Sequence, residues 1–358
     1  MASKRTKTDQ VERIFELRIK HGDYLLDGIP AERELCEELG VSRMTARKAL
    51  ERLVDKGLIE RMPNGRLAVK RKYEKHISVG LLVPSFASSS VERWRLALEN
   101  AAEDYEVRIR AFMFVHWDDP IILDVVKNFD AVFLNPSAEN IPARVMKNLQ
   151  AENESVVILD QDLTMYGIKS ICLFPSHFVQ KILDILGELG HKSVDCFNVQ
   201  TMDNVINSRI EQWNLWRAVH NINGRLLGDA LTPYSYPDTP LTGAYKQMLT
   251  IIDSGRFRST ALFCTTAPAA IGAMRAFMDR GVVVGRDVSV CVINDEGIAR
   301  YYNPSITSIE MIDPSPYLKV CIDRIRHPSS SWTGSLLLQP SEAAIYKGES
   351  TGPAPAKK

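Results

Sequence analysis

Apolar positions near the start of the chain repeat at helical spacing and are interrupted by turn signals. Residues 11–20 place their apolar side chains on one helical face, and two glycines and a proline end that pattern before residue 31. A second helical segment, residues 31–39, has acidic residues in its first turn and ends at Gly40, and Ser42 suits the cap of a third helix. Two helices joined by a turn of about three residues are the pattern of a helix-turn-helix.

The third predicted helix has an apolar face and a cationic face. The stretch GVSRMTARKAL, residues 40–50, alternates at helical spacing between two sets of side chains: Met44, Ala46, Ala49 and Leu50, and Arg43, Thr45, Arg47 and Lys48. A basic face alone is weak evidence, since most such faces are only solvated. Its meaning therefore depends on the segments around it.

A short hairpin follows the third helix. Apolar residues at 58–59 and 67–69 flank an Asn64-Gly65 turn, a residue pair typical of tight hairpins. Arg61 and Arg66 lie beside the predicted tip, where they suit contact with phosphate or with a minor groove. The helices and the hairpin together predict a winged helix-turn-helix domain.

Beyond a charged linker at residues 71–76, the pattern changes to short apolar runs separated by helix-length segments. The predicted strands are residues 77–85, 107–114, 129–134, 155–160, 193–199, 260–265 and 288–294. The predicted helices include residues 89–105, 177–189, 204–221 and 267–280. This alternation favours parallel sheets with helices on both faces, which is an α/β fold. The predicted organisation is a winged helix-turn-helix domain over residues 1–70, an α/β domain over residues 77–350 and a disordered tail over residues 351–358.

The charge of the chain is divided between the two predicted domains. Basic and acidic side chains number 44 each, but residues 1–76 hold 18 basic and 13 acidic ones, which leaves 26 and 31 for the remainder. Within residues 41–72 there are 10 basic and 3 acidic side chains. This local excess is the electrostatic footprint of a surface that neutralises phosphates.

Other classes of function lack their sequence signals. The six cysteines lie far apart and the seven histidines have no metal-ligand spacing, so we expect neither a metal site nor a cofactor. The loop after the first α/β strand, VPSFASSSVERW, contains no glycine and so is neither a dinucleotide fingerprint nor a phosphate loop, which counts against an enzyme. No apolar run reaches the roughly 20 residues of a membrane span, and MASKRTKTDQ is not followed by the apolar core of a signal peptide. We expect a cytoplasmic protein.

The segment that covers residues 29–69 resembles a known group of DNA-binding domains. IPAERELCEELGVSRMTARKALERLVDKGLIERMPNGRLAV is similar to the N-terminal domain of GntR-type bacterial transcription regulators, over roughly residues 8–70. The resemblance implies DNA contacts at Arg33, Ser42, Arg43, Thr45, Arg47 and Gly65. The fork of an arginine suits a guanine edge, and it equally suits phosphate, so the roles of Arg43 and Arg47 stay open.

The α/β region resembles the ligand-binding domain of LacI-type regulators, themselves similar to periplasmic sugar-binding proteins. The segments that carry the resemblance are ISVGLLVPS, LGELGHKSVDCF, IGAMRAFMDRGVVVGRDVSVCVIND, ARYYNPSITSI and LLLQPSEAAIYKGEST. It implies two α/β subdomains, chain crossings near residues 172, 306 and 338, and a small-molecule effector in the cleft between the subdomains. Carried over residue by residue, the effector contacts are Ser85, Phe86, Asp160, Arg209, Thr266 and Asn294.

Two features of this region bear on the effector. Trp213, on the same predicted helix as Arg209, is either a stacking face for a sugar ring or a core side chain. Thr266-Ala267 stands where such regulators commonly have Asn-Asp, and Asn294 replaces a common aspartate. These departures leave the chemical identity of the effector open.

The combined interpretation is a homodimeric transcription regulator, which we expect to act as a repressor. It binds double-stranded operator DNA of two-fold symmetry and responds to a carbohydrate-like small molecule. One alternative is a dimeric DNA-binding protein that responds to no ligand. A third reading is an α/β enzyme fused to a DNA-binding domain.

Overall fold

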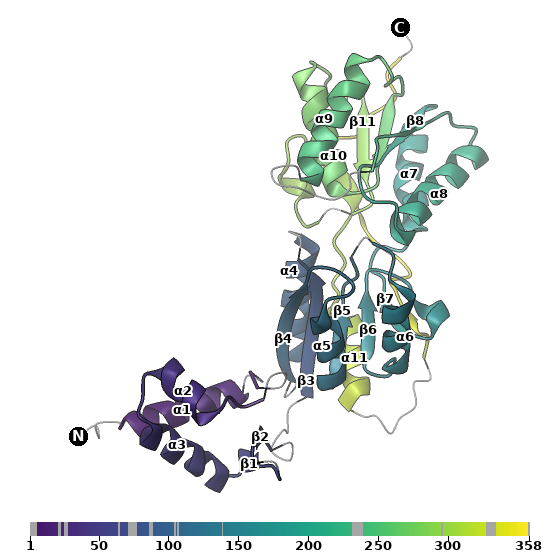
Figure 1. Cartoon of the computed structure of the whole chain (residues 1–358). Helices are drawn as coiled ribbons and strands as arrows, with labels where there is room; N and C mark the ends of the chain where they lie inside the picture. Colours follow the sequence, from purple (N-terminus) through teal and green to yellow (C-terminus); the bar gives the residue numbers. More distant parts are fainter. Residues whose placement is uncertain are drawn as a thin grey trace.

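The chain forms a small helical domain and two α/β subdomains in a row (Figure 1). The computed structural model describes residues 6–356 except 21–22, 25–27, 64, 71–76, 86–88, 104, 106, 138, 231–238, 295 and 327–333. The predicted linker 71–76 and two residues named above, Asn64 and Phe86, lie outside the described residues. The α/β fold class and the N-terminal winged helix-turn-helix are confirmed.

Three helices and a two-stranded hairpin build the N-terminal domain. They are α1 (Lys7–Lys20), α2 (Glu32–Leu39), α3 (Arg43–Asp55), β1 (Ile59–Arg61) and β2 (Leu67–Val69). The strands pair antiparallel. Helix α2 ends at Gly40, whose φ of 60° requires a residue without a Cβ penalty. The helices close over one apolar core, in which Phe15, Leu35 and Leu53 have no exposed surface.

The first α/β subdomain, called the N-subdomain below, holds a six-stranded sheet in the order β13-β7-β6-β5-β3-β4. All its strand pairs are parallel. Its elements are β3 (Ile77–Pro84), α4 (Ser89–Ala102), β4 (Val107–Phe114), α5 (Pro120–Asn128), β5 (Ala131–Leu134), α6 (Ala143–Ala151), β6 (Val156–Leu159), the 3-10 turn η2 (Thr164–Tyr166), β7 (Lys169–Ile171), α11 (Ser315–Arg326) and β13 (Leu337–Leu338).

The second subdomain, called the C-subdomain, holds a six-stranded sheet in the order β14-β12-β11-β10-β8-β9. Among its described strands, only β14 runs antiparallel to its neighbour. Its elements are α7 (Phe178–Glu188), β8 (Val194–Phe197), α8 (Asn204–Val219), β9 (Leu226–Leu227), α9 (Pro240–Asp253), β10 (Ala261–Cys264), α10 (Ala267–Asp279), β11 (Ser289–Val292), the 3-10 turn η3 (Ala299–Tyr301), β12 (Thr307–Ile309) and β14 (Ile345–Tyr346).

Three chain segments connect the subdomains. They follow β7, β12 and β13, and cover residues 172–177, 310–314 and 339–344. The crossing expected near residue 306 therefore lies later, because residues 307–309 still form β12 in the C-subdomain sheet. Thr307 and Ser308 are polar but fully buried, so hydropathy does not mark this strand. The crossing expected near residue 338 starts directly after β13.

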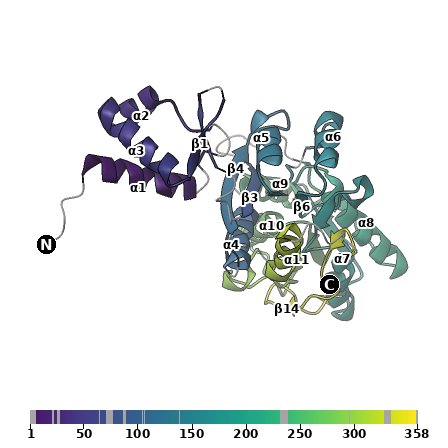
Figure 2. The ribbon, with the colours of Figure 1, turned by 90° about the horizontal axis from the view of Figure 1, so that it is seen from below.

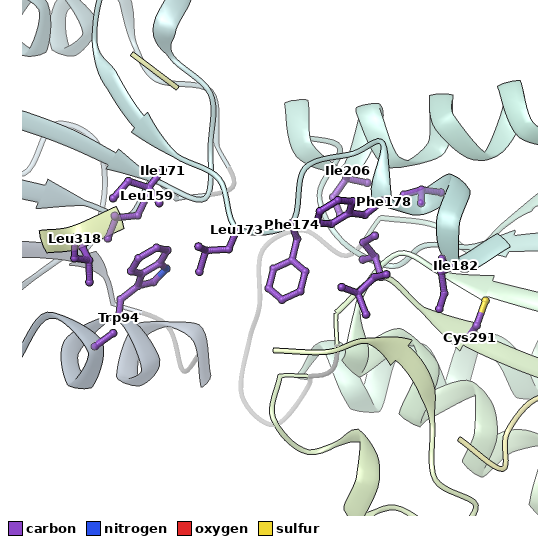
Figure 3. Close-up of a cluster of buried hydrophobic side chains, with 14 of the residues drawn as sticks. Trp94, Leu159, Ile171, Leu173, Phe174, Phe178, Ile182, Ile206, Cys291 and Leu318 are labelled. Carbon is purple, nitrogen blue, oxygen red and sulfur yellow. The ribbon is translucent and has the colours of Figure 1, made fainter. Parts of the chain in front are cut away.

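Buried apolar side chains continue from one subdomain into the other along the first crossing. Figure 3 shows Leu173 and Phe174 on this segment, between Leu159 of the N-subdomain and Phe178 of the C-subdomain. Leu173 has no exposed surface and Phe174 only 8 %. The packed crossing therefore fixes the region where the carboxyl ends of both sheets meet.

The expected disorder of residues 351–358 is wrong for the residues that the structure describes there. The backbone N–H of Gly352 donates to Ser289 Oγ over 3.0 Å, and the N–H of Ala354 donates to the carbonyl of Leu189 over 2.9 Å. Gly352 is buried. Backbone hydrogen bonds hold this segment against the sheet, and a composition poor in apolar side chains does not reveal them.

Candidate nucleic-acid interface and ligand cleft

Helix α3 begins with a capped turn that leaves its polar side chains outward. Ser42 is the N-cap with extended backbone, and its hydroxyl accepts the N–H of Thr45 over 3.2 Å. The two hydroxyl groups also hydrogen-bond over 2.9 Å. Arg43 is exposed beside them, and Met44 is 65 % exposed although it is apolar. The first turn of α3 thus presents a fixed, mixed polar and apolar surface.

Two of the predicted DNA contacts pair with acids on their own helices. Arg33 lies 3.2 Å from Glu37 on α2, and Arg47 lies 3.1 Å from Glu51 on α3. All four side chains are more than half exposed. Exposed pairs of this kind contribute at most about 1 kcal/mol, so a phosphate can compete for either guanidinium at little cost.

The hairpin tip supplies the remaining predicted contacts. Gly65 has a φ of 80°, and its N–H donates to the carbonyl of Met62 over 2.8 Å, which closes the turn. Arg61 donates to the carbonyl of Gly65 over 3.3 Å. Arg66 is exposed at the base of β2. The wing therefore carries two arginines on either side of a glycine turn.

A second set of cations in this domain is already neutralised. Arg52 at the end of α3 lies 2.9 Å from Asp9 and 3.1 Å from Glu12 on α1, and Lys56 lies 2.6 Å from Glu12. Hydrogen bonds from Thr6 lower the pKa of Asp9 to about 2, with a further contribution from Arg52. These charges join α1 to α3, and the charges at the start of α3 remain for a partner.

A cavity of about 290 Å³ lies where the subdomains meet. Asp160 and Arg209, both predicted effector contacts, line it together with residues of the first crossing such as Phe174 and His177. Its volume is near the lower end of the range of ligand pockets, roughly 300–1,000 Å³. The cavity lies at the carboxyl ends of β6 and β7, where ligands of open α/β sheets bind.

Asp160 is held in an unusual backbone conformation. It directly follows β6 and has a φ of 62°, which costs free energy for a residue with a Cβ. Its Oδ2 accepts the indole N–H of Trp94 over 2.7 Å and lies 3.6 Å from Arg93. Two side chains of α4 therefore fix the carboxylate of Asp160 at the rim of the cavity.

Arg209 is buried, with 8 % of its surface exposed. It donates to the backbone carbonyl of Thr265 over 2.7 Å, and its Nε has no hydrogen-bond partner among the described residues. Burial lowers the pKa of this guanidinium, opposed by the charges of Asp203, Asp160 and Glu296. The side chain is therefore positioned by a neutral group and retains unused donors.

Two further predicted contacts share this property. Thr266 Oγ1 and Asn294 Oδ1 are buried and have no partner among the residues that the structure describes. Thr266 is the residue before α10 and Asn294 follows β11, so both lie at strand ends of the C-subdomain. Most buried polar atoms in proteins are paired, so unpaired ones after the neighbouring strands β10 and β11 are candidates for contact with a ligand.

Ser85 and Trp213 were also predicted as effector contacts, but their surroundings differ from those of the residues above. Ser85 is exposed at the end of β3, and its backbone N–H donates to the carbonyl of Phe114. Trp213 is a core side chain, with 1 % exposure and its indole N–H donated to the carbonyl of Val194. The prediction that Trp213 offers a stacking face for a sugar ring is therefore wrong. Helix α8 runs back along β8, and Trp213 reaches Val194 at the amino end of that strand, away from the cleft.

Sequence reasoning missed two side chains of the N-subdomain that have buried polar atoms without a described partner. Arg93 on α4 lies near Asp160 and 5.8 Å from the ring centre of Phe174, and its Nε is buried without a partner in the described part of the chain. Ser137, after β5, likewise has a buried hydroxyl without a described partner. The rule that ligands bind beyond strand ends would have pointed to Ser137. No sequence pattern pointed to Arg93.

The described residues contain no group of three or more His, Cys, Asp or Glu side chains arranged to hold a metal ion. None of the described helices combines the length and the apolarity needed to cross a membrane.

Comparisons with known proteins match each domain separately. Residues 7–69 match the model of bacterial regulatory proteins of the gntR family, and residues 184–312 match the periplasmic binding protein-like domain. The chain joins a GntR-type helix-turn-helix domain to a periplasmic-binding-protein-like domain. The resemblances inferred from the motifs at residues 29–69 and in the α/β region are therefore confirmed.

Curated relatives of the chain carry the names of HTH-type transcriptional repressors. The chain is 40 % identical over 68 residues to the HTH-type transcriptional repressor NagR of Bacillus subtilis, which covers 18 % of this chain and 28 % of NagR. The probable HTH-type transcriptional repressor ExuR of the same organism is 20 % identical over 216 residues, 58 % of this chain and 60 % of ExuR. The chain thus spans less than two thirds of the length of these relatives.

Solved structures share the fold of the periplasmic-binding-protein-like domain. A lac repressor dimer bound to operator and to the anti-inducer ONPF has a TM-score of 0.63 at 17 % identity, covering 78 % of this chain and 96 % of that one. A LacI family regulator from Enterococcus faecium with bound ribose has a TM-score of 0.62 at 18 % identity, covering 77 % and 99 %. At these identities the likeness concerns the fold.

Proposed function

We propose that this protein is a cytoplasmic transcription repressor that acts as a homodimer on operator DNA and responds to a carbohydrate-like small molecule. The effector would bind between the N-subdomain and the C-subdomain. Closure of the subdomains around it would then change the arrangement of the two DNA-binding domains in the dimer.

The observation that carries this proposal is a set of buried polar atoms of the C-subdomain that have no described partner. They are Arg209 Nε on α8, Thr266 Oγ1 after β10 and Asn294 Oδ1 after β11, and Arg209 also lines the cavity between the subdomains. A polyhydroxylated ligand carries the donors and acceptors that these groups lack, and the guanidinium can hold two of its oxygens in one plane. The cavity volume of about 290 Å³ suits a ligand of monosaccharide size.

The DNA-binding part rests on the surface of α3 and on the wing. Arg43 and Arg47 are exposed on the first turns of a helix whose other face packs into the core of the domain. A helix of this kind fits a major groove, with the wing arginines directed at the backbone or the minor groove. The identity of 40 % to a curated repressor in this region supports the same role.

The homodimer is supported by two apolar surfaces. Strand β4 ends the order of the N-subdomain sheet, and its Met113 is 67 % exposed next to Val115 at 75 %. The C-subdomain has a hollow of about 740 Å³ lined by apolar residues of α9 and α10, among them Met274 and Met278. The exposed apolar side chains of Met113 and Val115 and the large apolar hollow are surfaces that a second copy would cover.

Thermal unfolding of the full chain against pentoses, hexoses, sugar acids, deoxy sugars and disaccharides tests the effector. A compound at 100 times its dissociation constant should stabilise the α/β domain by about 2.7 kcal/mol. Arg209→Ala should remove the response. Arg286→Ala, at a surface arginine that is 72 % exposed, is the matched control and should keep it.

The alternative, a dimeric DNA-binding protein without an effector, is favoured by the Thr266-Ala267 departure alone. It predicts operator binding by the full chain and no thermal response to any compound. The enzyme reading has no support from the matched families, which are a regulator family and a binding-protein domain.

A further inference from the structure

The end of helix α1 lies against the edge strand of the N-subdomain. Arg108 on β4 donates from Nη1 to the carbonyl of Ile19 over 2.9 Å, and Arg110 Nη1 lies 3.8 Å from the carboxylate of Asp23. Figures 1 and 2 both show the helix-turn-helix domain beside the β4 side of this subdomain. These contacts join the two domains in addition to the covalent connection of the chain.

The charge and the placement of the two arginines favour their contact with the end of α1. The last four carbonyls of a helix have no partner within it, and the helix dipole makes this end negative, so a guanidinium is attracted there. Side chains alternate along a strand, which puts Arg108 and Arg110 on one face of β4. Arg110 also stacks on Phe112, 5.3 Å from the ring centre, which restricts its orientation.

Helix α1 in turn fixes the orientation of the proposed recognition helix. Phe15 of α1 is fully buried in the same core as Leu50 and Leu53 of α3. Arg52 and Glu12 add an ion pair between the two helices. A contact that holds the end of α1 therefore also determines the direction in which the exposed face of α3 points.

We propose that Arg108 and Arg110 form a docking surface for the C-terminal end of α1, which makes the helix-turn-helix domain and the N-subdomain one rigid body. Movements of the N-subdomain would then be passed directly to α3, although no helix is predicted in the linker. The docking itself is independent of the proposed function. Its consequence for DNA spacing rests on that function.

Small-angle X-ray scattering of the full chain tests the docking. The double variant R108A/R110A should release the domain, which increases the radius of gyration and the flexibility signature of the scattering curve. Arg144→Ala removes an exposed arginine that pairs with Asp118 elsewhere in the N-subdomain, and should scatter like wild type. Equal curves for wild type and the double variant would overturn the proposal.

An exchange of the charges at residues 23 and 110 distinguishes loss of the contact from loss of folding. Asp23→Arg should loosen the contact without changing the sheet, and Asp23→Arg combined with Arg110→Asp should restore the compact curve. Failure of the exchange to restore compactness would count against the arginine contact as the cause. A retained thermal transition of the α/β domain shows that the variants are folded.

DNA spacing gives a second readout on operators selected from random sequence. Insertion of roughly 5 base pairs, half a helical turn, between half-sites should weaken wild-type binding by about tenfold or more, and R108A/R110A binding by less than about threefold. Equal sensitivity in both proteins would overturn the rigid-body proposal. Absence of any DNA binding would refute the proposed function, while the scattering result would still decide the docking.

Discussion

The helix-turn-helix domain pairs several exposed arginines with acids, whereas the C-subdomain of the α/β domain buries polar groups that have no described partner. Arg52 and Glu12 form an ion pair between helices, and Arg47 pairs with Glu51 along α3. At the cleft, Arg209 is held by a backbone carbonyl and Thr266 Oγ1 has no partner among the described residues. The first arrangement suits a polyanion that competes for exposed charges, and the second suits a small ligand that completes buried hydrogen bonds.

The two regions also differ in how much core supports them. Among the described residues, the helix-turn-helix core is one cluster of nine buried apolar residues, whereas one larger cluster in the α/β domain continues across both subdomains. Small domains bury a smaller fraction of their surface and are less stable. Mutations of equal size should therefore have unequal consequences in the two regions.

The largest expected effect is the loss of the helix-turn-helix fold in Phe15→Ala. Phe15 has no exposed surface, and its truncation should cost about 3–5 kcal/mol, which is comparable to the whole stability of a small domain. Calorimetry should show the loss of a separate small transition, and DNA binding should disappear. Phe263→Ala in the C-subdomain is the matched control, and it should lower the large transition while the small one persists. Loss of both transitions in Phe15→Ala would contradict independent folding.

The next effect concerns operator affinity. Arg43→Ala or Arg47→Ala should weaken binding by about 1–3 kcal/mol if the arginine reads a base, with loss of discrimination at one position. If it binds phosphate, affinity should fall uniformly and the slope of log K against log salt should decrease by about 1. Titrations at several salt concentrations separate the cases. Arg13→Ala, an exposed arginine on α1, should leave binding unchanged.

Acid should change the stability of the two domains over different pH ranges. Burial lowers the pKa of His191 below its ordinary 6.5, so the unfolded chain takes up this proton at a higher pH than the folded chain does. The free energy of unfolding of the α/β domain should therefore fall as the pH drops below 6.5, by at most about 1.4 kcal/mol per pH unit. Asp9 and Glu12 have lowered pKa values, so their contribution to the small domain is lost only below their ordinary values of 3.8 and 4.5.

Calorimetry at pH 7.5, 6.5 and 5.5 measures this difference. The large transition should move down between pH 6.5 and 5.5 while the small one stays in place, and His191→Gln should flatten the slope of the large one. Parallel movement of both transitions would count against His191 as the group responsible. The comparison uses slopes because His191 also hydrogen-bonds Thr260 and Ser289, so its replacement lowers the stability at every pH.

Regular elements could be predicted from the sequence wherever hydropathy has a period. The strand at residues 107–114 was predicted with the bounds that β4 has, and α10 differs from its prediction by one residue. Strands β7 and β12 were not predicted, because buried polar residues interrupt their apolar pattern. Lys169 in β7 is 7 % exposed and donates to the carbonyls of Asn153 and Glu154, so its charge is satisfied by contacts that no local pattern reveals.

The candidate site was predictable only where a motif names its residues. Arg209, Thr266 and Asn294 follow from the resemblance of their segments, and each has a buried polar atom without a described partner. Arg93 could not be found in this way, because its place at the cleft depends on Asp160, which is distant in sequence and meets it only in the folded subdomain. The role of Trp213 stayed open because helical spacing identifies the buried face of α8. It does not tell which end of β8 the side chain reaches.

The smallest expected effect compares two threonines that cap helices. Thr239 accepts the N–H of Thr242 over 3.2 Å at the start of α9, whereas Thr266 at the start of α10 makes no such bond. Thr239→Val should therefore destabilise the α/β domain by about 1 kcal/mol. Thr266→Val removes a buried hydroxyl without a described partner and should stabilise the ligand-free domain by about 1 kcal/mol.

The sign of this difference connects stability to binding. If the hydroxyl of Thr266 is kept for a ligand, Thr266→Val should raise the midpoint of thermal unfolding and reduce the shift that a responding compound produces. Thr239→Val should lower the midpoint and leave the shift unchanged. Lower midpoints in both variants would mean that Thr266 stabilises its own helix, and the cleft would then have one polar group fewer to offer an effector.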